Sequence, residues 1–225
     1  MRASREKRAD IIPVDTVINL MCAVAAKTGT GNPESSNLPI FNCTSGKTNP
    51  IYWSQIEDVA HEHIFKYPVE KMLWYPSGSF KSSAIVDETA KLFLNWIPAL
   101  ILDLILLVLR QKPFLLRITS RMIKATNALR YFSTRDWQWH VKNSEILEKS
   151  LSDADRRIFN FDISSVDWNT FLEKYVLGTR RYVLKLSDDS LPECQRKLQR
   201  FYYAHLALCS GLFSIVSYFI MYTIF

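Results

Sequence analysis

Along most of the chain, apolar residues recur with the spacing of amphipathic helices. Residues 17–24 carry one such stripe and residues 52–65 are compatible with a second helix. The fullest stripe, at residues 168–176, places apolar side chains at i, i+3, i+4, i+7 and i+8. Residues 73–83 have the composition of a loop between helices. The pattern therefore predicts a chain built mainly of α helices.

Polar residues and glycines stand where these helices are expected to begin or end. Asp15 is able to cap the first helix, and Ser152 opens a short helix as S-x-x-D with Asp155. Asp167 comes directly before the fullest apolar stripe and is a cap candidate for it, while Gly178 is its C-cap candidate. The sequence thus offers a cap residue at each end of that helix.

One short segment has the pattern of a strand instead of a helix. Residues 39–43, PIFNC, are apolar and lie between turn-forming residues, which predicts a buried strand. The sequence therefore predicts a small α/β piece near the start of an otherwise helical chain.

The run 206–225, LALCSGLFSIVSYFIMYTIF, contains no charged side chain. About 20 apolar residues are enough for a helix to cross the ~30 Å hydrocarbon core of a bilayer. Arg196, Lys197 and Arg200 precede the run and nothing basic follows it, so the positive-inside rule leaves the bulk of the chain in the cytosol. A buried core helix is the alternative, which we disfavour because core helices are usually amphipathic. We predict a single-pass C-terminal membrane anchor.

A second apolar run, residues 92–109, is 18 residues long and is interrupted by Asp103. An aspartate near the centre of a spanning helix costs roughly 2.5–3.5 kcal/mol. The residues alone leave three placements open, namely a helix at the membrane interface, a helix buried in the protein, and a spanning helix.

The formal charge of +6 is concentrated in one part of the chain. Residues 110–142 contain eight basic side chains and one acid, Asp136, so this region carries +7 and the remainder −1. Arg117, Arg121 and Lys124 fall on one face of a helix, with apolar residues between them. Such a helix suits an anionic membrane surface, and an ordinary solvated face is the alternative. A nucleic acid partner is not expected, because no recognition motif is present.

Motifs for catalysis, nucleotide binding and metal binding are missing from the sequence. There is no G-x-G-x-x-G, P-loop, G-x-S-x-G or H-E-x-x-H motif. His61 and His63 lie two residues apart, so they do not share a helix face, and the four cysteines have no C-x-x-C spacing. Caps and turns explain the aspartates that could otherwise be paired as acid and base, which are Asp153, Asp155, Asp162 and Asp167. We predict no catalytic, cofactor-binding or metal-binding residue in this chain.

Several long segments resemble the animal-type fatty acyl-CoA reductases. ADIIPVDTVINLM and PIFNCTSGKTNPIYWSQI are similar to the end of that family's Rossmann domain. From Ala99 onward the chain resembles the helical, or male-sterility, C-terminal domain, through PALILDLILLVLRQKP, YFSTRDWQW, FNFDISSVDW and YVLGTRRYVLK. A terminal apolar helix is also usual in the family.

This resemblance implies NADPH-dependent reduction of long-chain fatty acyl-CoA to a primary fatty alcohol and CoA, at the membrane of the endoplasmic reticulum or peroxisome. The family's dinucleotide fingerprint and its catalytic Tyr-x-x-x-Lys pair would lie upstream of residue 1, so no site residue is carried over. We therefore expect a fragment of a longer protein that is inactive alone. The alternative is a non-catalytic, tail-anchored interaction module.

The resemblance also divides the chain into expected domains. Residues 1–70 would end a Rossmann-like domain, residues 71–91 would be a linker, residues 92–203 would form the helical domain, and residues 204–225 the transmembrane helix. Because the first and third regions are expected to act together in the family, the apolar run after the linker should not change sides of the membrane. It should lie in the interface or pack within the protein.

Overall fold

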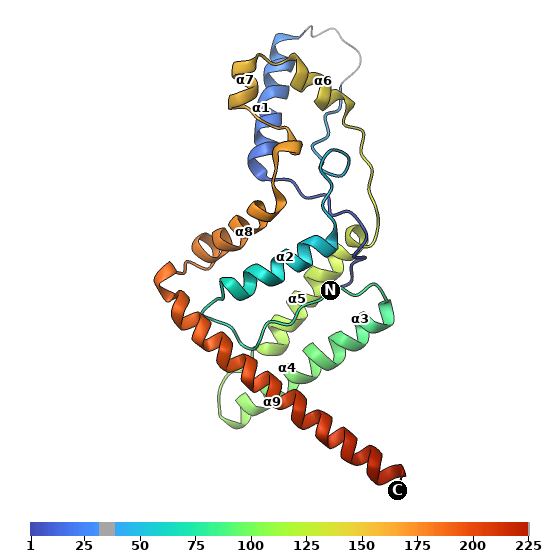
Figure 1. Cartoon of the computed structure of the whole chain (residues 1–225), viewed down its shortest axis with the longest axis vertical. Coiled ribbons are helices and arrows are strands. Elements are labelled where there is room, and N and C mark those ends of the chain that lie inside the picture. The colour runs from blue at the N-terminus through green and yellow to red at the C-terminus, as the bar shows by residue number, and fades with distance from the viewer. Residues whose placement is uncertain (32–38, 225) are drawn as a thin grey trace. The chain divides into compact units, whose positions relative to one another are not determined.

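The structure, a computed structural model, describes residues 1–31 and 39–224 (Figure 1). Within these residues the secondary structure is helical, with two isolated β bridges and no strand. The α helices are α1 (Val14–Thr30), α2 (Trp53–Lys66), α3 (Ala84–Lys91), α4 (Ile97–Val108), α5 (Leu115–Ser133), α6 (Lys142–Ser150), α7 (Asp153–Ile158), α8 (Trp168–Gly178) and α9 (Leu191–Ile224). The prediction of a mainly α fold is confirmed for this part of the chain.

The chain divides into two compact units, each made of two segments. The first unit comprises residues 1–57 and 79–168, and the second comprises residues 58–78 and 169–225. The predicted loop at 73–83 is confirmed, since the chain has no helix between the end of α2 and the start of α3. That loop carries the chain out of the second unit and back into the first.

The predicted strand at residues 39–43 is wrong. The segment is coil, and Ile40 is 73% exposed. Its polar groups are satisfied by neighbouring chain instead of by a β ladder: Asn143 donates to the Ile40 carbonyl at 2.8 Å, and Ser144 donates to the Asn42 carbonyl at 2.8 Å. No strand lies beside it among the described residues, so its short apolar run has no sheet to join.

The core of the first unit lies between α1 and α6. Leu20 and Ala23 of α1 pack with Leu147 of α6 and with Phe161. The stripe predicted on α1 is therefore only partly right, because Met21 and its neighbour on that stripe, Ile18, are exposed. The helix is apolar on more than one side, and periodicity alone could not choose the side that is buried.

The ends of the helices follow the sequence prediction in part. Ser152 caps α7 as predicted, accepting the backbone N–H of Asp155 at 3.1 Å. Asp15 does not cap α1, because Pro13 holds the cap position and Asp15 lies in the first turn. Gly178 is the last residue of α8 but not its C-cap: its φ is −63°, and the chain continues as a π helix, Thr179–Val183. This continuation carries Arg180 into the interior of the second unit.

The helix predicted at residues 168–176 exists, but its burial is uneven. Leu172 is buried, whereas Tyr175 is 65% exposed. Trp168 is half-buried, and its indole N–H donates to the carbonyl and side-chain oxygens of Asn49 at 3.2 and 3.0 Å. The amphipathic pattern correctly indicated a helix and overstated how much of it is covered.

In the part of the chain that the structure describes, two helices are long and apolar enough to cross a membrane, Ala84–Val108 and Asp188–Tyr222. The first combines α3, a π turn at Leu92–Trp96 and α4. The second includes most of α9, which runs to the C-terminus in Figure 1.

Candidate membrane anchor and basic pocket

The outer half of α9 has the composition and length of a membrane anchor. From Leu206 to Ile224 it has no charged residue, and 19 residues of helix extend about 28 Å, close to the ~30 Å hydrocarbon core. Among the residues described there, none of its most apolar stretch is buried inside the protein. Phe225, the last residue of the predicted anchor, lies outside the described residues. An apolar C-terminal helix is thus present.

An aromatic cluster, here called the aromatic collar, lies on α9 just before the uncharged stretch begins. It consists of Trp74 and Tyr75 from the loop after α2, with Phe201, Tyr202 and His205 from α9. The Trp74 ring lies 6.0 Å from that of Phe201, and its indole N–H donates to His205 Nδ1 at 3.3 Å. Tryptophan and tyrosine gather where a membrane protein passes from head groups to hydrocarbon.

Basic residues lie on the other side of the collar from the apolar stretch. Arg196, Lys197 and Arg200 belong to α9 and line a hollow of about 510 Å³ together with Glu70 and Lys71. Lys197 donates to the carbonyl of Glu70 at 2.7 Å, which attaches the loop after α2 to this helix. The order along α9 is therefore cations, aromatic rings and uncharged helix.

Arg180 is the largest fully buried side chain among the described residues, with 1% exposure. Its guanidinium donates to the Pro68 carbonyl at 2.6 Å, the Ser187 carbonyl at 2.8 Å and the Ser190 hydroxyl at 2.6 Å. These bonds join the loop after α2 to the turn before α9. Arg180 thus holds the backbone that carries the collar, and its position was not evident from the sequence, where it is one of two adjacent arginines.

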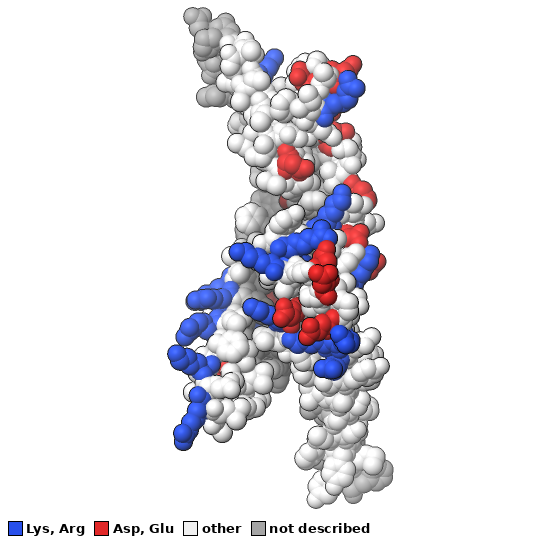
Figure 2. Space-filling view, turned by 90° about the vertical axis from the view of Figure 1, so that its left-hand side faces the viewer, with Lys and Arg blue, Asp and Glu red and all other residues white. Residues whose placement is uncertain are grey.

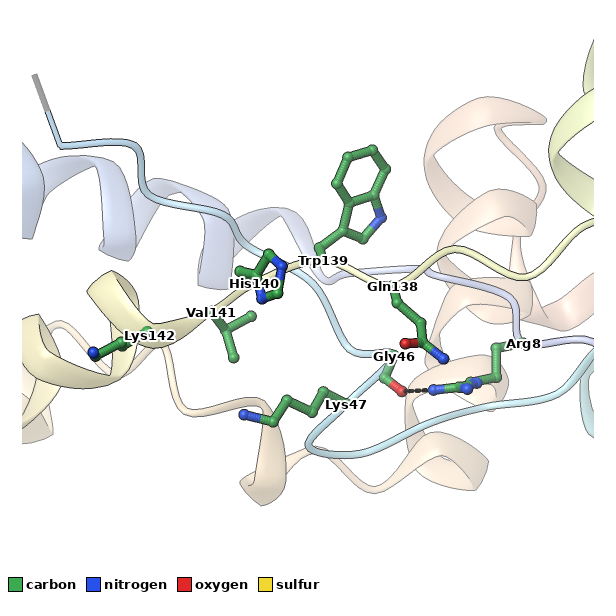
Figure 3. A pocket seen from close by; sticks show the side chains of 8 residues that line it. All are labelled: Arg8, Gly46, Lys47, Gln138, Trp139, His140, Val141 and Lys142. Atoms are coloured by element: carbon green, nitrogen blue, oxygen red, sulfur yellow. Dashed lines mark hydrogen bonds between the residues drawn. The ribbon is translucent and has the colours of Figure 1, made fainter.

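The first unit has a basic pocket of about 490 Å³ between the loop at 46–47 and the segment at 138–142 (Figure 3). Arg8, Lys47 and Lys142 contribute cations, and none of the described residues that line it is acidic. Figure 3 shows Gln138 and Val141 on the side of Lys47, while Trp139 points to the opposite side of its backbone. Such a lining suits a ligand that carries phosphate or another anion.

The cations of this pocket differ in how firmly they are already engaged. Arg8 donates to the Gly46 carbonyl at 2.7 Å, and its backbone N–H donates to Asp136 at 2.9 Å. The hydrogen bond from that N–H, and to a smaller extent the charge and hydrogen bond of Lys7, hold the pKa of Asp136 below its usual range. Lys47 makes an exposed ion pair with Glu145 at 3.4 Å, which is weak in water. The lysines are therefore the groups available to an incoming anion.

The residues weighed in the sequence as metal ligands or acid–base pairs have local roles. His61 contacts the Gly78 carbonyl, whereas His63 is buried, and no group of three or more metal-ligating side chains occurs in the described part of the chain. Asp155 belongs to the capping box of α7, Asp153 pairs with Arg156 at 3.8 Å, and Asp162 accepts the N–H of Ser164 at 2.8 Å. The structure does not bring these aspartates together as a pair at a pocket.

Tyr67 and Lys71 have the Tyr-x-x-x-Lys spacing, but they do not form the corresponding site. Both lie in the loop after α2, so the i, i+4 spacing does not place them on one helix face. The Tyr67 hydroxyl instead donates to Glu173 at 2.6 Å, and Lys66 donates to the same oxygen at 2.9 Å. These hydrogen bonds lower the pKa of Glu173 and raise that of Lys66.

A dinucleotide cofactor does not fit the residues present. Its pyrophosphate is normally held by a glycine-rich turn between a strand and a helix. The sequence has no G-x-G-x-x-G, and the described residues contain no strand from which such a turn could start. No reaction step through NADPH can therefore be assigned to side chains of this chain.

The amino-acid sequence is similar to proteins of one known family. Residues 94–186 match the family described as male sterility protein. The chain is 33% identical over 200 residues to fatty acyl-CoA reductase 1 of Rattus norvegicus, a match that covers 89% of this chain and 38% of the relative. It is 33% identical over 207 residues to fatty acyl-CoA reductase 2 of Homo sapiens, covering 92% and 40% respectively.

The chain thus spans about two fifths of the length of these curated relatives, while nearly all of it is matched. The resemblance expected from FNFDISSVDW and YVLGTRRYVLK is confirmed, since both segments lie largely within the matched domain. The mainly helical fold and the apolar C-terminal helix agree with it. The chain belongs to the fatty acyl-CoA reductase family.

Proposed function

We propose that this chain serves NADPH-dependent reduction of long-chain fatty acyl-CoA to a primary fatty alcohol and CoA, as the helical, membrane-anchored part of the enzyme. The observation that carries the proposal is the match of about nine tenths of the chain to two fatty acyl-CoA reductases. A membrane position suits the chemistry, because the acyl chain and the alcohol product both partition into lipid.

In this proposal the domains keep the division expected from the sequence. Residues 1–70 end the Rossmann-like domain, residues 71–91 link it to the helical domain at 92–203, and residues 204–225 cross the membrane. The bulk of the chain faces the cytosol, at the endoplasmic reticulum or peroxisome. The order of cations, aromatic collar and uncharged helix along α9 supports this orientation.

The basic pocket would hold the phosphates of the CoA portion. CoA is an anionic nucleotide, and Lys47 and Lys142 are cations with little or no competing partner. Reversing both charges should weaken CoA binding to the detergent-solubilised chain roughly tenfold or more, because each charged hydrogen bond contributes ~1.5–3 kcal/mol. Reversing the exposed Lys27 and Lys149, which lie outside the pocket, is the matched control. Equal CoA affinity in the pocket variant and the control variant would mean that the basic pocket does not bind the CoA phosphates.

A non-catalytic interaction module is the second candidate. It is favoured by the lack of a dinucleotide fingerprint in the sequence and of a strand among the described residues. In that case the helical domain and the anchor would act without hydride transfer.

A chimera separates the two candidates. Placing this chain in rat fatty acyl-CoA reductase 1, instead of the region that it matches, should preserve formation of fatty alcohol in membranes supplied with NADPH and long-chain acyl-CoA. The relative without that region is the negative control, and limited proteolysis checks that the chimera is folded. A folded, membrane-bound chimera that makes no alcohol would favour the interaction module.

Glycosylation mapping tests the orientation. An acceptor placed between Lys142 and Ser150 should stay unmodified in microsomes, whereas one added after Phe225 should be modified. The second acceptor is the control for access to the enzyme. Modification of the internal acceptor would mean that the helical domain lies in the lumen, and the proposed orientation would be abandoned.

A further inference from the structure

The exposed surface of α4 consists of apolar side chains. Leu100, Ile101, Leu104 and Ile105 are each about half exposed, and the charged residue of this helix, Asp103, is only 3% exposed. Contiguous apolar surface of this kind marks a place where a protein meets a partner or a lipid phase.

Asp103 is turned away from that surface because it caps the next helix. Its carboxylate accepts the backbone N–H groups of Phe114, Leu115 and Leu116 at 3.0, 2.9 and 2.9 Å. Those groups form the start of α5 and would otherwise lack partners. The contact folds α5 back along α4, so the two helices form a hairpin, and it explains how an aspartate is accommodated in the apolar run.

The helix α5 has two different exposed faces beside the face that packs on α4. Ile118, Met122 and Leu129 form an apolar face. Next to it runs a basic stripe of exposed side chains, Arg117, Arg121 and Lys124. Figure 2 shows Lys and Arg side chains gathered in a column on one face, with few acidic side chains among them. Cations bordering an apolar face complement a surface that offers both phosphates and acyl chains.

The hairpin is poorly suited to cross a bilayer. Asp87 and Lys91 pair at 2.7 Å in the interior of the first unit, so the helical stretch beyond them, residues 92–108, extends only about 26 Å. If α4 spanned the bilayer, α5 would return through it and place its basic stripe in hydrocarbon. Each of those cations costs roughly 2.5–3.5 kcal/mol at the bilayer centre.

We propose that the α4–α5 hairpin lies in the plane of the membrane surface, with its apolar faces among the acyl chains and its basic stripe on the phosphates of anionic lipids. It would be a second membrane contact besides the anchor, and it holds whether or not the chain takes part in reduction. A protein partner is disfavoured as the occupant, because it would have to match α4's wholly apolar surface and the adjacent cations together.

Photo-crosslinking in the full chain tests this placement. Benzoylphenylalanine is introduced singly at Leu104 or Met122, and the chain is reconstituted into phosphatidylcholine vesicles with or without phosphatidylserine. Both positions should give lipid adducts, and more with phosphatidylserine. Ile158 of α7, which is exposed and apolar but lies off the hairpin, is the matched negative position. Phe213 of α9 should label in every case and reports the anchor separately.

Charge reversal then tests the lipid phosphates. The triple variant Arg117→Glu, Arg121→Glu and Lys124→Glu should lose the gain from phosphatidylserine at Met122. The control variant reverses three exposed lysines off the hairpin, at positions 27, 149 and 174, and has the same net charge as the first variant. It should still give more lipid adducts at Met122 when phosphatidylserine is present. Lipid adducts at Phe213 but none at the hairpin above the level of Ile158, or adducts to a protein, would overturn the proposal while leaving the anchor intact.

Discussion

Replacing Arg180 by methionine tests whether one buried cation organises the second unit. Methionine keeps most of the apolar volume and removes three charge-assisted hydrogen bonds, to Pro68, Ser187 and Ser190. At ~1.5–3 kcal/mol each, their gross loss is partly offset by the several kcal/mol that it costs to bury a guanidinium. The net destabilisation of this unit is expected to be about 2–4 kcal/mol, because the carbonyl of the buried Pro68 also loses its donor, whereas the Ser187 carbonyl still accepts from Ser190.

Hydrogen exchange of the detergent-solubilised chain measures this effect locally. Some amides exchange only when the second unit opens, including those in the loop after α2. A loss of about 2–4 kcal/mol should speed exchange at these amides roughly 30- to 700-fold. Amides around the core residues Leu20 and Leu147 in the first unit should change little.

The neighbouring arginine provides a matched control. Arg181 is half exposed and pairs with Asp188 at 2.6 Å, so Arg181→Met should leave exchange in the second unit nearly unchanged. If amides of the second unit exchanged at the same rate in the Arg180→Met and Arg181→Met variants, the structural role of the buried guanidinium would be refuted.

Four further outcomes are expected. Trp168→Ala should destabilise the first unit by less than the ~3–5 kcal/mol of a fully buried tryptophan, since the indole is half-buried, and Trp168→Phe should show in a thermal melt what part of that loss comes from its bond to Asn49. The pKa of Asp136 is lower in the folded chain than in the unfolded chain, so its contact with Arg8 should stabilise the fold fully above the ordinary aspartate pKa near ~4. This stabilisation should fade as the pH falls through the lower pKa of the folded chain. Asp136→Asn should make proteolysis near the N-terminus independent of pH over that range. A chain ending at His205 should lose carbonate-resistant membrane association, and persistence of that association would count against α9 as the anchor. The purified chain alone should consume no NADPH with long-chain acyl-CoA, and turnover above background would reveal a catalytic group that the sequence does not show.

Local sequence determined the features that depend on near neighbours. The uncharged length of α9 predicted an apolar C-terminal helix, because hydropathy needs no tertiary partner. Ser152 and Asp155 predicted their own capping box, since both partners lie within one turn. The ordered segments FNFDISSVDW and YVLGTRRYVLK were sufficient to indicate the family.

Tertiary structure decided the features whose partners lie far along the chain. Trp74 meets His205 across 131 positions, and Arg180 meets Pro68 across 112, so no periodicity within a helix could reveal the collar or the buried guanidinium. The segment at 39–43 had the composition of a strand, but a strand requires a neighbouring strand, and α6 supplied side-chain hydrogen bonds instead. Asp103 shows the same dependence: the sequence alone left a charge in an apolar run without explanation, and the fold supplied the three N–H donors that make burial of this carboxylate favourable.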